Sequence, residues 1–114
     1  MAAPGNFDVA IHRDGSALVV APHGEIDLAT VGLVRQAVER EQHWGDDVVL
    51  DLRGVDFLDT SGLRYVLEVN ECAARDGFTL HVVRGPRAVQ RVFEVAGVES
   101  RLPFVDDHEA AAEE

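Results

Sequence analysis

The chain has 114 residues, 46% of them hydrophobic, and a formal net charge of −11 at pH 7, because 21 aspartates and glutamates outnumber 10 basic residues. All the basic residues are arginines, and Cys72 is the only cysteine. The length fits one folded domain, and the acidic balance disfavours nucleic-acid binding, because it repels the phosphate backbone. The absence of lysine excludes Schiff-base enzymes and lysine-containing phosphate loops, and one cysteine excludes an intramolecular disulfide and a multi-cysteine metal site.

The sequence carries no signal for the membrane. Residues 1–5 contain neither a basic stretch nor a long apolar core, so we expect no signal peptide. No apolar run approaches the ~20 residues that a membrane helix needs. We therefore expect a soluble cytoplasmic protein with no membrane contact.

The first half of the sequence predicts two strands, a helix and a third strand. Apolar and polar residues alternate over 7–12, and a turn signal separates them from a second apolar run at 17–22, which predicts an antiparallel hairpin. The period then becomes helical over 28–42, with Asp27 as a suitable N-cap. Residues 48–52 are apolar and β-branched, which is typical of a central strand covered on both faces.

The second half of the sequence predicts two more helices, each followed by a strand. Helical spacing over 62–75 ends at Gly77, and an alternating strand follows at 78–83. Pro86 opens a third helix, and residues 102–105 form a short edge strand. The residues of the second helix expected to face the core are Leu63, Val66, Leu67, Asn70 and Ala74, and those of the third are Val89, Val92, Phe93 and Ala96.

The predicted element order is β-β-α-β-α-β-α-β. Strands that alternate with helices predict an α/β fold with a mixed, mostly parallel sheet and amphipathic helices packed against it. We expect one domain over residues 5–106 and a solubilising acidic tail over 107–114. We expect Trp44 to fill the corner between the first helix and the following strand, with an exposed anchor as the alternative.

The sequence contains no recognisable motif for metal binding or catalysis. The five histidines are far apart, and neither a phosphate-binding glycine pattern nor a G-x-S-x-G nucleophile pattern occurs. We therefore expect no metal, no cofactor and no enzymatic activity. A small enzyme that uses the carboxylates of Asp56 and Asp59 is the alternative.

Residues 56–63 are the most informative segment, because they follow the central strand and open the second helix. Functional residues of a parallel α/β sheet gather beyond the carboxyl ends of its strands. Asp59, Thr60 and Ser61 are also residue types that cap the free N–H groups at a helix start. From the residues alone, a structural cap and an exposed functional hydroxyl both remain open.

Three segments together resemble the STAS domain. They are G-E-I-D at 24–27, V-V-L-D-L at 48–52 and F-L-D-T-S-G-L at 57–63. The resemblance covers residues 7 to 105 and is greatest to the single-domain anti-sigma factor antagonists of bacteria.

The resemblance implies a protein that acts by binding and does not itself catalyse a reaction. In this family the unphosphorylated antagonist binds an anti-sigma factor with a serine/threonine kinase fold and thereby frees a sigma factor. The kinase phosphorylates the hydroxyl directly after the aspartate of the motif, and a metal-dependent phosphatase removes the phosphate. That position is Thr60 here, where many relatives have serine.

The resemblance also suggests a partner-binding surface around this hydroxyl. Its residues are Glu25, Asp27, Asp59, Ser61, Gly62 and Arg64. Glu25 and Asp27 can equally form a turn and a helix cap, and Arg64 can form a solvated i, i+4 ion pair with Glu68. The alternative function is a STAS accessory subunit of a membrane transport complex, which shares the fold but is not switched by phosphate.

Overall fold

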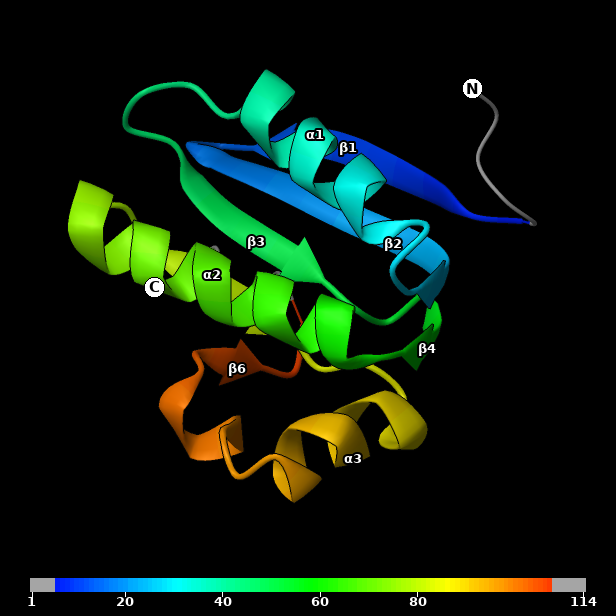
Figure 1. Cartoon of the computed structure of the whole chain (residues 1–114). Helices are drawn as coiled ribbons and strands as arrows, with labels where there is room; N and C mark the ends of the chain where they lie inside the picture. Colours follow the sequence, from blue (N-terminus) through cyan, green and yellow to red (C-terminus); the bar gives the residue numbers. More distant parts are fainter. Residues whose placement is uncertain (1–5, 108–114) are drawn as a thin grey trace.

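The computed structural model describes residues 6–107, which form a six-stranded sheet and three α-helices (Figure 1). The strands are β1 (Asp8–Asp14), β2 (Ala17–Ile26), β3 (Asp47–Asp51), β4 (Val55–Leu58), β5 (Leu80–Val83) and β6 (Phe104–Val105). The helices are α1 (Val31–Glu41), α2 (Thr60–Asp76) and α3 (Arg87–Val95), with a short 3-10 helix at Glu99–Arg101. The predicted α/β class with a mixed sheet is confirmed, and β4 and the 3-10 helix are additions to the predicted order.

The sheet is antiparallel only where β1 pairs with β2, and every other pairing in the described chain is parallel. The strand order is β1-β2-β3-β5-β6, and β4 pairs with β2 beside this path. The first half of β2 lies along β3 and its last residues lie along β4, with a register shift between Gly24 and Glu25. Gly24 has a φ of 111°, which favours glycine, and its N–H donates to the Gly54 carbonyl at 3.0 Å. This bend brings the start of α2 beside the end of β2.

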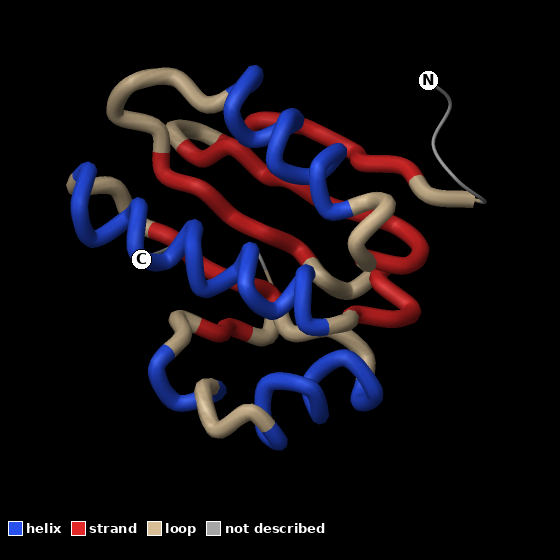
Figure 2. The backbone as a smooth tube through the Cα atoms, viewed as in Figure 1, coloured by secondary structure: helices blue, strands red, loops and turns tan. Residues whose placement is uncertain are grey.

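Helices α1 and α2 lie side by side across one face of the sheet, and α3 packs near its β4 and β6 side (Figures 1 and 2). The ring of Phe93 on α3 meets that of Phe104 on β6 edge-on, with centroids 5.1 Å apart. A smaller cluster of Ala17, Val19, Val49 and Val83 is buried on the other face. The side chains of β3 from Val48 to Asp51 are all buried, as predicted for a central strand.

The buried face of α2 is shifted by one residue toward the N-terminus from the predicted face, and only Val66 belongs to both. Its buried residues are Gly62, Tyr65, Val66, Val69 and Ala73. The prediction was wrong because it placed Leu63 and Leu67 in the core, whereas both side chains are only partly buried and pack against the edge of the core. The small Gly62 faces inward in their place. On α3, Val89 and Phe93 are buried as predicted, but Ala96 is exposed.

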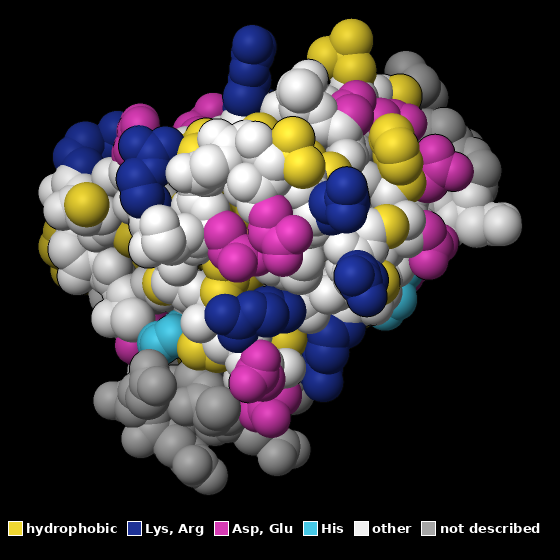
Figure 3. All heavy atoms as spheres, turned by 90° about the horizontal axis from the view of Figure 1, so that it is seen from below, with side chains coloured by type: hydrophobic (Ala, Val, Ile, Leu, Met, Phe, Trp, Pro, Cys, Tyr) yellow, Lys and Arg dark blue, Asp and Glu magenta, His cyan; other side chains and the backbone are white. Residues whose placement is uncertain are grey.

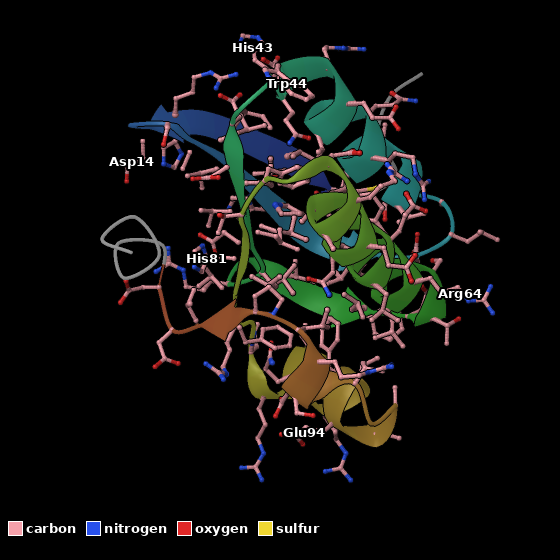
Figure 4. All side chains as sticks on the ribbon, turned by 90° about the vertical axis from the view of Figure 1, so that its left-hand side faces the viewer. Asp14, His43, Trp44, Arg64, His81 and Glu94 are labelled. Atoms are coloured by element: carbon pink, nitrogen blue, oxygen red, sulfur yellow. The ribbon has the colours of Figure 1, made fainter. Side chains whose placement is uncertain are left out.

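Trp44 does not fill the corner between α1 and β3, so that prediction was wrong. Its side chain is 95% exposed, in a turn where the N–H of Asp46 donates to the His43 carbonyl at 3.0 Å. Figure 4 shows Trp44 and His43 at the outer end of this connection. The acidic tail expected over 107–114 lies outside the described residues apart from Asp107. Among residues 6–107, no helix has both the length and the hydropathy to cross a membrane.

Candidate functional site

The junction between β4 and α2 is held together by the Asp59 side chain. Asp59 is the N-cap of α2, and its Oδ1 accepts hydrogen bonds from the N–H groups of Ser61 at 2.8 Å and Gly62 at 3.2 Å. The Ser61 hydroxyl donates to the same oxygen. Burial alone would raise the pKa of the Asp59 carboxyl, but these hydrogen bonds outweigh it and lower the pKa below its ordinary value. Asp59 therefore caps the helix, and Ser61 supports the cap.

Thr60 begins α2 with an exposed side chain. Its hydroxyl makes no hydrogen bond within residues 6–107, and the capping position is occupied by Asp59. A pocket of about 390 Å³ adjoins it. The other residues that line this pocket are Leu63 of α2 and Ala88, Arg91, Val92, Val95 and Ala96 of α3 and its C-terminal end. We call this space the α2–α3 pocket.

Glu25 lies near the end of β2, and Asp27 lies in the connection from β2 to α1. The Thr30 hydroxyl donates to the Glu25 carbonyl at 2.7 Å and accepts from the Asp27 N–H at 2.9 Å, so the turn is tightly closed. Asp27 Oδ1 accepts from the N–H groups of Ala29 and Thr30 at 2.9 and 3.1 Å. The prediction that Asp27 is the N-cap of α1 was wrong, because the helix starts later and Thr30 is its N-cap. Asp27 stabilises the preceding turn, while the Glu25 side chain is exposed.

The strand pairing brings these two segments to the same end of the sheet. Ile26 lies opposite Leu58 in the parallel pair of β2 and β4, and the Asp59 N–H donates to the Ile26 carbonyl at 3.1 Å. Both strands end here, as expected for the functional edge of a parallel sheet. Gly62 is buried beneath this edge, where an added Cβ would lie 2.8 Å from Leu58 Cγ and 2.9 Å from Ile26 Cγ2. It positions α2 by packing and presents no side chain to a partner.

Arg64 lies one turn after Thr60 and does not pair with Glu68, so the predicted ion pair was wrong. Glu68 instead accepts two hydrogen bonds from Arg35 of α1, at 3.1 and 3.2 Å. The Arg35 guanidinium also lies 5.1 Å from the centre of the Tyr65 ring, and these contacts join α1 to α2. The Arg64 side chain is exposed and points outward from the start of α2 (Figure 4).

Several exposed apolar side chains near this end of the molecule were missed from the sequence. Leu28 is 83% exposed in the turn before α1, Phe57 is 49% exposed on β4, and Val95 is 78% exposed at the end of α3. Figure 3 shows arginine, acidic and hydrophobic side chains intermixed over the α3 side of the molecule. For Val95 the available signal was α3 itself, which has more apolar residues than one buried face can hold.

The site contains one exposed hydroxyl, that of Thr60, which makes no hydrogen bond within residues 6–107. Within residues 6–107, no three His, Cys, Asp or Glu side chains are placed to hold a metal ion. The carboxylates of Asp27 and Asp59 serve local hydrogen bonds. At the ends of β2 and β4, these two carboxylates therefore already have hydrogen-bond donors.

Comparison with known proteins identifies the family. The family model of the STAS domain matches residues 8–111. The chain belongs to the STAS-domain family. An anti-sigma F factor antagonist from Paenibacillus polymyxa is 26% identical to this STAS domain over 106 residues, which is 90% of this chain and 89% of the relative.

Two solved structures are similar to this STAS domain over most of its length. An anti-sigma factor antagonist from Mycobacterium paratuberculosis superposes with a TM-score of 0.82 and 27% identity, over 100% of both chains. The anti-sigma factor antagonist SpoIIAA in its unphosphorylated form superposes with a TM-score of 0.74 and 17% identity, over 93% of this chain and 95% of the other. The second likeness is one of fold, and the first extends to sequence.

Proposed function

We propose that this STAS domain is an anti-sigma factor antagonist switched by phosphorylation of Thr60. In its unphosphorylated form it binds an anti-sigma factor serine/threonine kinase in the cytoplasm and releases a sigma factor. The kinase phosphorylates Thr60 and ends the binding, and a metal-dependent serine/threonine phosphatase restores it. This role needs no cofactor and no catalysis by the chain itself.

The exposed Thr60 hydroxyl is the observation that carries the proposal. It directly follows the capping aspartate, and the fold does not use it for a hydrogen bond within residues 6–107. A kinase can therefore reach it without unfolding the helix start. The names of the relatives from Paenibacillus polymyxa and Mycobacterium paratuberculosis support the same role.

The proposed partner surface surrounds Thr60. Glu25 and Arg64 supply exposed charges to this surface. Asp27, Asp59 and Ser61 shape the two backbone turns through their hydrogen bonds. Gly62 contributes by allowing α2 to approach Leu58 closely.

The direct test is incubation of the purified chain with candidate anti-sigma factor kinases and ATP, followed by mass-spectrometric site mapping. We expect one phosphate on Thr60 and none on the Thr60→Ala variant. Ser61→Ala is the matched control, because it removes the adjacent hydroxyl and should still be phosphorylated.

Two results would contradict this proposal. Phosphate on Ser61 with Thr60 unmodified would refute the assignment of the acceptor. Stable binding to an ATPase subunit of a transporter, with no phosphate transfer by any kinase, would favour the accessory-subunit function.

A further inference from the structure

Thr60 and Arg91 line the same α2–α3 pocket, whose surface is almost entirely apolar. Thr60 lines it from α2 and Arg91 lines it from α3, and the other lining residues have aliphatic side chains or are alanines. We propose that a phosphate on Thr60 forms an ion pair with Arg91 across this pocket. The inference rests on the proposed function, because it concerns what the phosphate does once Thr60 carries it.

Arg91 has no competing partner in the described part of the chain. The arginines of residues 6–107 that form ion pairs with carboxylates are Arg13, Arg35, Arg53, Arg75 and Arg84. Arg91 is exposed and makes neither an ion pair nor a side-chain hydrogen bond within those residues. A guanidinium can donate two parallel hydrogen bonds to a phosphate, so the side chain is chemically suited to this ligand.

The neighbouring arginines are less well placed than Arg91. Arg64 follows Thr60 by one turn of α2 and Arg87 precedes Arg91 by one turn of α3, but neither lines the pocket. The carboxylate of Asp59 is held by the Ser61 and Gly62 N–H groups at the helix end. Arg91 is therefore the cation that shares a surface with the Thr60 side chain.

The pairing would change what the pocket presents to a partner. A phosphate drawn toward Arg91 lies over Leu63 and Val92, which line the space between the two helices. Phosphorylation then covers an apolar surface and engages the Arg91 guanidinium, which a partner can no longer contact. It also adds negative charge. The switch works by local masking, with no change of fold.

Phosphorus NMR can test the pairing without any kinase. Phosphothreonine is installed at position 60 by amber suppression in the full chain, and the second pKa of the phosphate is measured by pH titration. An unpaired phosphate has a second pKa of about 6, and a nearby guanidinium lowers it by favouring the dianion. We expect Arg91→Ala to raise this pKa by about half a unit, the size expected for one solvent-exposed ion pair. Arg87→Ala, the matched control, should leave it unchanged.

Methyl NMR of the same samples gives a second measurement. The methyl signals of Leu63 and Val92 should shift on phosphorylation in the parent chain and shift less in the Arg91→Ala variant. The proposal is overturned if Arg91→Ala and Arg87→Ala give the same phosphate pKa, or if only Arg64→Ala raises it. Because the phosphothreonine is incorporated during translation and not by a kinase, failure of every kinase to modify Thr60 would refute the proposed function without altering this result.

Discussion

Replacement of Gly62 by alanine tests whether close packing fixes the start of α2. A Cβ at this position would lie 2.8 Å from Leu58 Cγ and 2.9 Å from Ile26 Cγ2. Both neighbours are buried, with 2% and 3% of their surface exposed, so neither can move without disturbing the core. Overpacking costs about 1–3 kcal/mol, whereas alanine gains about 1 kcal/mol over glycine inside a helix. We therefore expect the free energy of unfolding to fall by up to roughly 2 kcal/mol.

Urea unfolding followed by circular dichroism measures this change as a lower midpoint with an unchanged slope. Gly32→Ala is the matched control, because Gly32 lies in α1 and an added Cβ there meets nothing within 4 Å. That variant should gain up to about 1 kcal/mol from helix propensity. If Gly62→Ala is stabilised as much as Gly32→Ala, close packing does not fix α2 and the reasoning is refuted.

The other predictions concern the cap, the acceptor and the surface. Thr60→Glu or Thr60→Asp should weaken binding to the anti-sigma factor kinase in calorimetric titrations, while Thr60→Ala should bind and should not be switched off by phosphorylation. Equal affinities for all three variants would contradict the switch. Asp59→Ala should lower the free energy of unfolding by about 0.5–2 kcal/mol. Because the folded state lowers the pKa of Asp59, its contribution is present above the unfolded pKa of about 3.9 and disappears as the pH falls through the lower folded value. Asp59→Asn should keep most of the stabilisation that the cap provides at pH 7. Its free energy of unfolding should depend less on pH, which urea titrations from pH 7 to pH 3 would reveal. Trp44→Ser should leave the melting temperature unchanged because Trp44 is 95% exposed, whereas Phe93→Ala should cost about 3–5 kcal/mol; a similar loss in both would contradict the assigned burial.

Elements with a long, regular pattern were predictable from the sequence. The hairpin of β1 and β2 and the three helices follow from periodicity, and the buried strand β3 follows from its run of apolar, β-branched residues. Strand β4 was missed because four residues are too few to show alternation, and its pairing depends on the distant bend at Gly24. The buried face of α2 was misassigned because Gly62, which has no side chain, faces the core where a leucine was expected.

The candidate site was predictable only as far as its contacts are local. The cap formed by Asp59 and Ser61 involves residues two or three apart, and residue types alone indicated it. The role of Asp27 depends on where α1 begins. The helix begins after Thr30 and not directly after Asp27, so Asp27 does not cap it. The partner of Glu68 is Arg35, 33 residues away on another helix. The α2–α3 pocket likewise joins segments far apart in the chain, so no local pattern could indicate that Arg91 lies near Thr60.

The order of residues at the helix start separates stability from regulation. Asp59 accepts the hydrogen bonds that α2 needs, and Ser61 reinforces that carboxylate. Thr60 stands between them with an exposed side chain and no hydrogen bond from its hydroxyl within residues 6–107. A phosphate there would therefore break no hydrogen bond of the cap, while its charge of about −1.5 to −2, only partly offset by Arg91, would act on any partner at this surface. A loss of about 1.4 kcal/mol lowers affinity tenfold, so a modest repulsion is enough to switch binding in an intact domain.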